Sequence, residues 1–245
     1  MHVTPSPWQR GLVGGLLALL LVGWSAGCVR VEQTLRLNDD GSGSLSLRYG
    51  MAESDLAEME SLAKSQLAEE GVTEAAPVNP FEFDEAQVRK DFEDYRSLGV
   101  TLEDIRTEVV EGWKYMSLRI AFTSLAGLGQ TEFLSDRQVT LKRLAEGRYE
   151  LVQAAPPGTD EATEAMDPEA MAGLMKGFRA VLRVELPGAV VETNADEKEG
   201  ARASWIFDVD KDARALERAQ RVAMRVVFEK PGLSLVEYAS PVIAE

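Results

Sequence analysis

The sequence has almost none of the side chains on which most enzymes depend. Among its 245 residues the only histidine is His2 and the only cysteine is Cys28. A mature chain beginning at Cys28 therefore has no imidazole and cannot form an internal disulfide. This excludes histidine bases, Cys–His and Ser–His nucleophiles, structural zinc and haem ligation by histidine. Carboxylate pairs, Ser–Lys arrangements and carboxylate-bound metals remain, and we expect a non-enzymatic protein without cofactor or metal.

Basic residues are also few compared with acidic ones, since the sequence has 26 Lys and Arg and 41 Asp and Glu. Arg10 is the only charged residue before Cys28, so the rest of the chain has 25 basic residues and a net charge of −16. Binding to a phosphate backbone needs clustered Lys and Arg, and docking onto anionic headgroups needs a basic surface. We therefore expect no nucleic-acid partner and no electrostatic attachment to anionic lipids.

The N-terminal 27 residues have the pattern of a bacterial lipoprotein signal peptide. Arg10 supplies the positive charge, and residues 11–24 form an unbroken run of apolar residues and glycine. This run is shorter than the ~20 residues that a membrane-spanning helix needs, but it fits the apolar region of a signal peptide. Ser25-Ala26-Gly27-Cys28 then resembles a lipobox, with Ser25 where Leu is usual. We predict cleavage before Cys28 and lipid modification of its thiol, which anchors the protein to a membrane.

Two other readings of this segment stay open: an ordinary signal peptide cut after Ala26 or Gly27, and an uncleaved N-terminal anchor. Val29, rather than Asp, follows the cysteine. By the sorting rule for lipoproteins, this predicts the outer membrane, facing the periplasm, if the host has two membranes.

The rest of the chain predicts hairpins joined by helices. Alternating apolar residues predict strands, and helical spacing begins at Ser54, the expected N-cap. The predicted strands are 29–37, 45–49, 100–110, 113–123, 138–144, 149–153, 181–186, 203–209 and 222–228. The predicted helices start at Ser54, Asp84, Asp167 and Lys211. Without regular βαβ alternation, this predicts an α+β fold with a mainly antiparallel sheet and helices packed on one face.

We expect one domain over residues 28–230, with a helical segment at about 52–98, and a C-terminal tail at 231–245. Residues 229–245 are broken by Pro231, Gly232 and Pro241, so we expect no closing transmembrane segment.

Three motifs could carry chemistry, and each favours a structural role. Asp208-Val209-Asp210-Lys211-Asp212 has the spacing that starts a calcium loop, but Ala213 and Ala219 stand where Gly and Glu are needed, so we expect a helix cap. Residues 38–43 are expected to form a hairpin turn. Residues 127–129 lack the rest of a phosphate loop and are expected to form a bend. The methionine and leucine stripes (Met51, Met59, Met171, Met175) could line an adaptable pocket, although ordinary core packing is favoured.

Two stretches resemble the LppM-like family of bacterial lipoproteins. One is Cys28-Val29-Arg30-Val31, followed by a strand, residues 38–41 and a second strand. The other is residues 184–194 (VELPGAVVETN), followed by Ala203-Ser204-Trp205. The resemblance implies a strand ending in a Pro-Gly turn, then an Asn, then a returning Trp-centred strand. It also implies binding of lipids or lipid-like envelope molecules, but it assigns no ligand-binding residue. Members of the family often end in a transmembrane helix, which is not expected here.

These observations favour a membrane-anchored, non-enzymatic envelope lipoprotein that binds a lipid or another hydrophobic ligand near the membrane. The alternative is a module that binds an envelope protein and has no small-molecule pocket. A carboxylate-dependent hydrolase is the third hypothesis. An apolar cavity of about 300 Å³ or more would favour the first. A filled core with an exposed apolar patch would favour the second, and converging buried carboxylates the third.

Overall fold

The computed structural model describes residues 29–70, 81, 85–131, 133–134, 139–155, 169, 172–173 and 175–239, without the side chains of 62–70. The predicted signal peptide and Cys28 lie outside these residues. So does most of the helix predicted from Asp167.

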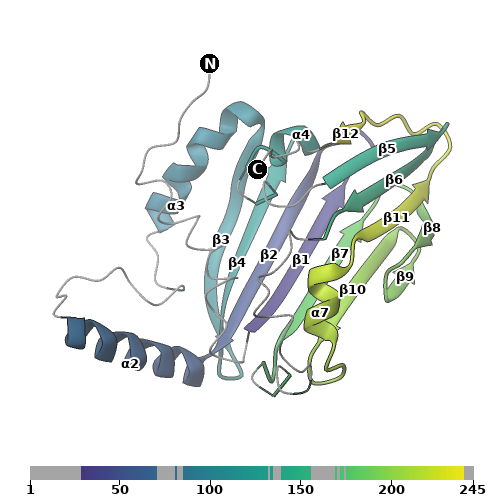
Figure 1. Cartoon of the computed structure of the whole chain (residues 1–245). Coiled ribbons are helices and arrows are strands. Elements are labelled where there is room, and N and C mark those ends of the chain that lie inside the picture. The colour runs from purple at the N-terminus through teal and green to yellow at the C-terminus, as the bar shows by residue number, and fades with distance from the viewer. Residues whose placement is uncertain are drawn as a thin grey trace.

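A seven-stranded sheet, the large sheet, runs through the molecule (Figure 1). Its order is β3 (Val100–Val110), β4 (Trp113–Phe122), β2 (Gly43–Ala52), β1 (Val29–Leu37), β7 (Arg179–Glu185), β10 (Arg202–Asp208) and β9 (Glu197–Glu199). Only β1 and β7 pair in parallel, and the other neighbours are antiparallel. The first strand of the described chain therefore lies in the middle of this sheet.

A five-stranded sheet, the small sheet, lies in front of the half of the large sheet that contains β1, β7 and β10 (Figure 1). Its order is β12 (Tyr238–Ala239), β5 (Val139–Ala145), β6 (Arg148–Gln153), β11 (Met224–Glu229) and β8 (Ala189–Thr193), all antiparallel. The prediction of an α+β fold with mainly antiparallel pairing is confirmed. The prediction of one sheet with helices on one face is wrong, because a second sheet covers much of that face.

Helices are short or peripheral in the described part of the chain. They are α2 (Glu53–Glu70), α3 (Glu85–Asp91), the 3-10 helix η2 (Phe92–Leu98), α4 (Leu125–Leu128) and α7 (Ala215–Arg221). Helix α2 begins at Glu53, one residue before the expected cap at Ser54. None of the described helices is both long and apolar enough to cross a membrane.

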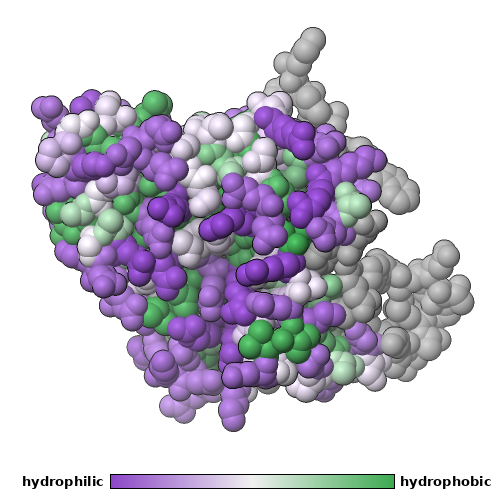
Figure 2. Space-filling view, turned by 180° about the vertical axis from the view of Figure 1, so that it is seen from behind, coloured by the Kyte–Doolittle hydropathy of each residue, from purple (hydrophilic) through white to green (hydrophobic). Residues whose placement is uncertain are grey.

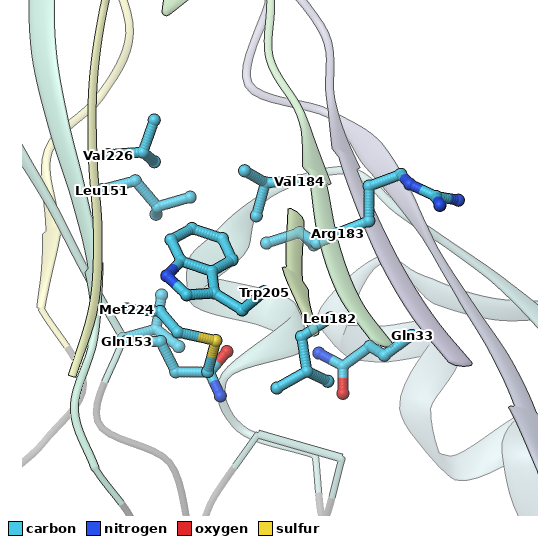
Figure 3. A pocket seen from close by; sticks show the side chains of 11 residues that line it. Gln33, Leu151, Gln153, Leu182, Arg183, Val184, Trp205, Met224 and Val226 are labelled. Carbon is cyan, nitrogen blue, oxygen red and sulfur yellow. The ribbon is translucent and has the colours of Figure 1, made fainter. Parts of the chain in front are cut away.

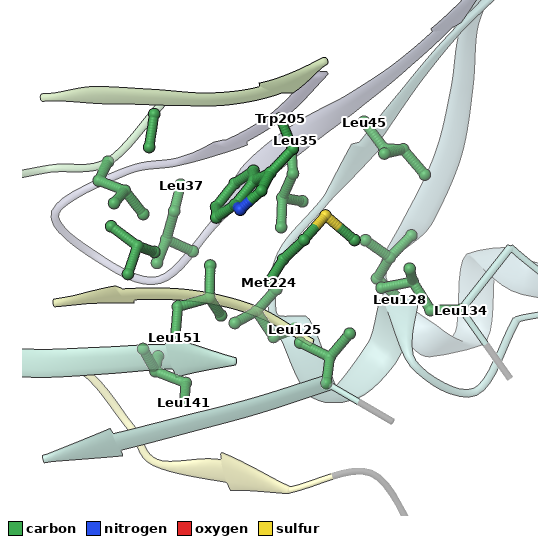
Figure 4. Packing of buried hydrophobic residues seen from close by; sticks show 14 of the residues in the cluster. Leu35, Leu37, Leu45, Leu125, Leu128, Leu134, Leu141, Leu151, Trp205 and Met224 are labelled. Atoms are coloured by element: carbon green, nitrogen blue, oxygen red, sulfur yellow. The ribbon is translucent and has the colours of Figure 1, made fainter. Parts of the chain in front are cut away.

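The main core lies between the two sheets (Figure 4). Alternate residues of the large sheet, such as Leu35, Leu45 and Trp205, face Leu151 and Val226 of the small sheet. Each of these five side chains is at most 6% exposed. A second cluster containing Met51, Leu56, Phe81, Ile105, Met116 and Leu118 continues the same face of the large sheet toward α2.

The domain continues past Lys230, its expected last residue. Leu233 and Leu235 are buried in the main core, and β12 pairs with β5. The Tyr149 hydroxyl accepts a hydrogen bond of 2.8 Å from the Leu235 amide. Residues 231–239 therefore belong to the folded domain.

Residues 184–194, which carry part of the family resemblance, form the connection between the sheets. The chain leaves β7 at Pro187-Gly188 and enters β8 of the small sheet. A Cβ atom at Gly188 would lie 2.4 Å from the Glu229 carbonyl oxygen, so the close approach to β11 requires glycine.

Asn194, directly after β8, then links the sheets by hydrogen bonds. Its Oδ1 accepts from the Trp205 indole N–H at 3.1 Å and from the Arg225 amide at 2.9 Å. Its Nδ2 donates to the Ala223 carbonyl at 2.7 Å. One side chain thus joins β10 of the large sheet to the start of β11 in the small one.

Replacing Asn194 with Ala should lower the free energy of unfolding by about 1–3 kcal/mol, because the buried Trp205 N–H loses its acceptor. Urea unfolding followed by tryptophan fluorescence measures this loss. Asn38→Ala, in an exposed turn where Asn38 bonds Ser42, is the matched control and should cost less. Equal losses in the two variants would show that Asn194 does not hold the sheets together.

Candidate functional site

A narrow apolar slot lies between the two sheets (Figure 3). Leu182, Val184 and Trp205 line it from the large sheet, and Leu151 and Val226 from the small sheet. Its volume is about 20 Å³, which admits one water molecule. An acyl chain needs a cavity more than ten times larger, so the sheets would have to move apart to admit one.

Polar amides and a methionine lie at one side of this slot (Figure 3). Gln33 of β1 and Gln153 of β6 line it together with Met224. The Nε2 of Gln153 is buried and has no hydrogen-bond partner among the described residues. A buried amide without a partner costs free energy, so this is where a polar group of a ligand would be favoured.

No group in the described lining of the slot is suited to catalysis. Among the described lining residues only Arg183 is charged, and its guanidinium donates to the Ser204 hydroxyl at 3.4 Å. The Trp205 N–H is already bonded to Asn194. The slot as it stands can hold a water molecule, and its described lining offers no acid–base pair.

The aspartates of the failed calcium motif do not converge on a common point. Asp208 pairs with Arg179 at 3.6 Å, and Asp210 accepts from the Gly177 amide at 3.0 Å. Asp212 accepts from the Arg214 amide at 3.0 Å, and this bond is the main reason that its pKa is lowered. No group of three or more metal-ligating side chains occurs within the described residues.

The helix cap expected from residues 208–212 is therefore formed only in part. The helix start predicted at Lys211 is wrong. Helix α7 begins at Ala215, four residues after the predicted start at Lys211, because residues 208–212 first form a turn. Only Asp212 bonds to an amide at the helix start, and the other two carboxylates point to different partners.

The two remaining motifs have structural roles. Residues 38–43 form the predicted hairpin turn, in which the Asp40 carboxylate accepts from the Ser42 hydroxyl at 2.6 Å and from its amide. The hydroxyl bond is the first cause of the lowered pKa of Asp40. Gly127, in the helical turn α4 rather than the expected bend, packs so closely that a Cβ would lie 2.0 Å from the Leu98 carbonyl oxygen. This glycine is required for packing, not for phosphate binding.

The methionine stripes do not form a common pocket. Met51 and Met175 are buried in different clusters, and Met59 packs against the cluster of Met51. Met171 lies outside the described residues. The methionine that does line the slot is Met224, which lies within the predicted strand 222–228.

Gln33 is the slot residue that the sequence could have indicated. It occupies an inward position between Val31 and Leu35, where the alternation of β1 calls for an apolar side chain. A polar residue on the buried side of a strand signals a special contact. Gln153 and Trp205 could not be assigned to the same slot, because their juxtaposition depends on which strands face each other across the sheets.

A second polar group on the inner face of the large sheet is the Tyr49 phenol. Its ring stacks on Phe81 with centroids 5.7 Å apart, and its hydroxyl is buried without a hydrogen-bond partner among the described residues. Burial raises the pKa of Tyr49 to about 12. The neutral phenol is thus favoured at every physiological pH, which rules out Tyr49 as a base.

Comparisons with known proteins find similarity only to solved structures. No protein-family model matches the chain, and no curated protein matches it. Among solved structures, the chain is similar to the folded domain of LppM from Mycobacterium tuberculosis, determined by NMR. The two share 15% identity with a TM-score of 0.43, over 84% of this chain and 92% of that one. At this level the likeness assigns neither family nor function, and the LppM-like resemblance stays a prediction.

Alkaline titration should show one tyrosine of this protein ionising near pH 12, and Tyr49→Phe should remove that step. Because the folded-state pKa of Tyr49 lies above the ordinary 10, its contribution to stability is complete below pH 10 and is lost as pH rises through 12. Rapid pH-jump absorbance of tyrosinate measures the step before unfolding. Tyr95→Phe is the control and should leave it in place. A wild-type titration without a step near pH 12 would contradict the burial of Tyr49.

Proposed function

We propose that this chain is a membrane-anchored, non-enzymatic lipoprotein of the bacterial cell envelope, in which Cys28 is lipid-modified and the domain acts by binding. The observation that carries the proposal is the absence of any spacer: β1 begins at Val29, directly after the lipobox cysteine. The domain is thereby held at the bilayer surface. In a host with two membranes, the predicted site is the outer membrane, facing the periplasm.

How completely side chains fill the space between the sheets determines whether a ligand could bind there. With a slot of only about 20 Å³, the space between the sheets is almost filled by side chains. Exposed large apolar residues are instead found at the surface, at Val109, Val110, Leu144 and Val236. A filled core with exposed apolar residues supports a module that binds partners, such as envelope proteins, through its surface.

Acylation of Cys28 is the first test. Cys28→Ser should abolish incorporation of labelled fatty acid and leave the precursor uncleaved, because the thiol is the acceptor of the lipid. Ser25→Leu, which restores the usual lipobox residue, is the matched variant and should be processed at least as well as the wild type. Acyl labelling and intact mass of the protein in the membrane fraction measure both. An unchanged mass and membrane fraction in Cys28→Ser would refute the anchor.

A second candidate function is the binding of a lipid or another hydrophobic molecule in the slot. The specific observation in its favour is that an apolar lining lies beside the adaptable Met224 and the Gln153 Nε2, which has no hydrogen-bond partner among the described residues. Binding would require the sheets to separate, at the cost of contacts between Trp205 and the small sheet.

Native mass spectrometry with lipid extraction separates the two candidates. The filled interior predicts that no lipid co-purifies in a fixed ratio with the protein. If lipid is found, Leu182→Trp should reduce its amount by roughly tenfold, the equivalent of about 1.4 kcal/mol, because the larger side chain fills the slot. Val236→Trp, at a fully exposed position, is the matched control. Bound lipid that is insensitive to Leu182→Trp would place the ligand elsewhere.

A further inference from the structure

One end of the large sheet combines the start of β1 with an exposed hairpin. Val29 pairs with Met51, Met51 with Lys114, and Lys114 with Val109, so these residues form one row across four strands. At about 4.8 Å per strand, Val109 lies roughly 14 Å from Val29 within the sheet. The β3–β4 hairpin therefore turns at the same end at which the chain enters β1.

The hairpin presents apolar side chains to solvent. Val109 is 55% exposed and Val110 is 41% exposed. Both turn residues have positive φ, 53° at Glu111 and 76° at Gly112, as in the tight turns that hairpins favour. Seen from behind, the surface is mostly hydrophilic, with a hydrophobic patch toward the lower end, where this hairpin turns (Figure 2). We call residues 109–113 the hairpin tip.

A stack of aromatic and cationic side chains holds Trp113 of the hairpin tip in place. The Arg30 guanidinium lies 3.7 Å from the Trp113 ring centroid, and Trp113 stacks on Tyr115 at 6.3 Å. The Arg48 guanidinium lies over the Tyr115 ring, 3.7 Å from its centroid. The stack needs Gly50, since a Cβ there would lie 2.3 Å from the Tyr115 ring.

This composition is typical of the interface between a bilayer and water. Trp and Tyr are enriched at headgroup depth, where an apolar ring and a polar N–H or O–H are both accommodated. Apolar side chains such as Val109 and Val110 can enter the acyl boundary below. Arg30, next to Trp113, can donate to lipid phosphate or carbonyl oxygens.

We infer that the hairpin tip inserts into the headgroup region of the leaflet in which Cys28 is anchored. The inference rests on the proposed anchor. The Cα atoms of residues 28 and 29 are 3.8 Å apart in a trans peptide, so an anchored Cys28 holds the start of β1 next to the lipid. The hairpin tip lies at the same end of the sheet and is therefore held close to the lipid as well. The start of β1 and the hairpin tip then both contact the membrane. These two contacts orient the domain with this end of the large sheet toward the bilayer.

The charges near the hairpin tip select the type of lipid surface. Lys114 and Arg30 are balanced by Glu111 and by Glu53, whose amide donates to the Gly112 carbonyl at 2.9 Å. Such a mixed surface is not attracted to anionic membranes as a basic patch would be. The apolar residues provide the driving force, and zwitterionic phospholipids suffice.

The distribution of tryptophan in the chain provides a direct test. After Cys28 the sequence has only Trp113 and Trp205, and Trp205 is 2% exposed in the core. The mature lipidated protein is reconstituted in phosphatidylcholine–phosphatidylethanolamine vesicles whose acyl chains carry bromine near the headgroup. The emission of Trp113, obtained by subtracting a Trp113→Phe sample, should fall by about half, as for a ring at headgroup depth. The emission of Trp205 should not change.

Matched variants separate insertion from anchorage. Val109→Glu combined with Val110→Glu should restore the Trp113 emission while the protein still floats with the vesicles. Val236 is 87% exposed and lies two residues before β12, a strand at the other end of the molecule from the β3–β4 turn (Figure 1), so Val236→Glu should leave the quenching unchanged. Flotation without quenching of Trp113, or quenching that the double variant does not change, overturns the inference and leaves the anchor intact. Failure of the wild type to float overturns the anchor, and the insertion with it.

Discussion

The architecture depends on the contact between Trp205 and the small sheet, fixed by the Asn194 side chain. A tryptophan between two sheets buries a large apolar area but carries an N–H that needs an acceptor. Asn194, directly after β8, supplies that acceptor and simultaneously bonds the backbone of Ala223 and Arg225. The indole can therefore point out of the large sheet into the small one without leaving a buried donor unsatisfied. The width of the slot beside it follows from this arrangement.

Much of the secondary structure could be predicted because the alternation of apolar residues is regular. Strand β3 has the predicted bounds of 100–110, and β4 begins at the predicted residue 113 and ends one residue early, at Phe122. What the sequence could not indicate is the division of the strands between two sheets. Strands of both sheets show the same alternation, since each sheet buries one face against the other. The Pro-Gly turn after β7 predicts a change of direction but not that the next strand, β8, belongs to the other sheet.

The candidate site was predictable only where a residue broke its local pattern. Gln33 does so, as a polar residue on the inward side of β1. Residues 208–212, by contrast, have the spacing of a calcium loop, but each of their three carboxylates has a separate neighbour in the structure. The stack of Arg30, Trp113, Tyr115 and Arg48 had no signal in the sequence, because its members come from three strands and meet only through the register. The lipid modification of Cys28 remains a prediction from the sequence alone.

The central place of β1 has a mechanical consequence for a tethered protein. Lateral drag or pulling on the membrane would reach the domain through Val29 and act along the axis of β1. That strand is bonded on both sides, to β2 over its whole length and to β7 from Arg30 to Arg36. A force along the strand loads these hydrogen bonds together in shear, whereas an edge strand pulled sideways would be peeled off one bond at a time. If Cys28 is anchored as proposed, the tether is joined to a strand that is hydrogen-bonded on both sides.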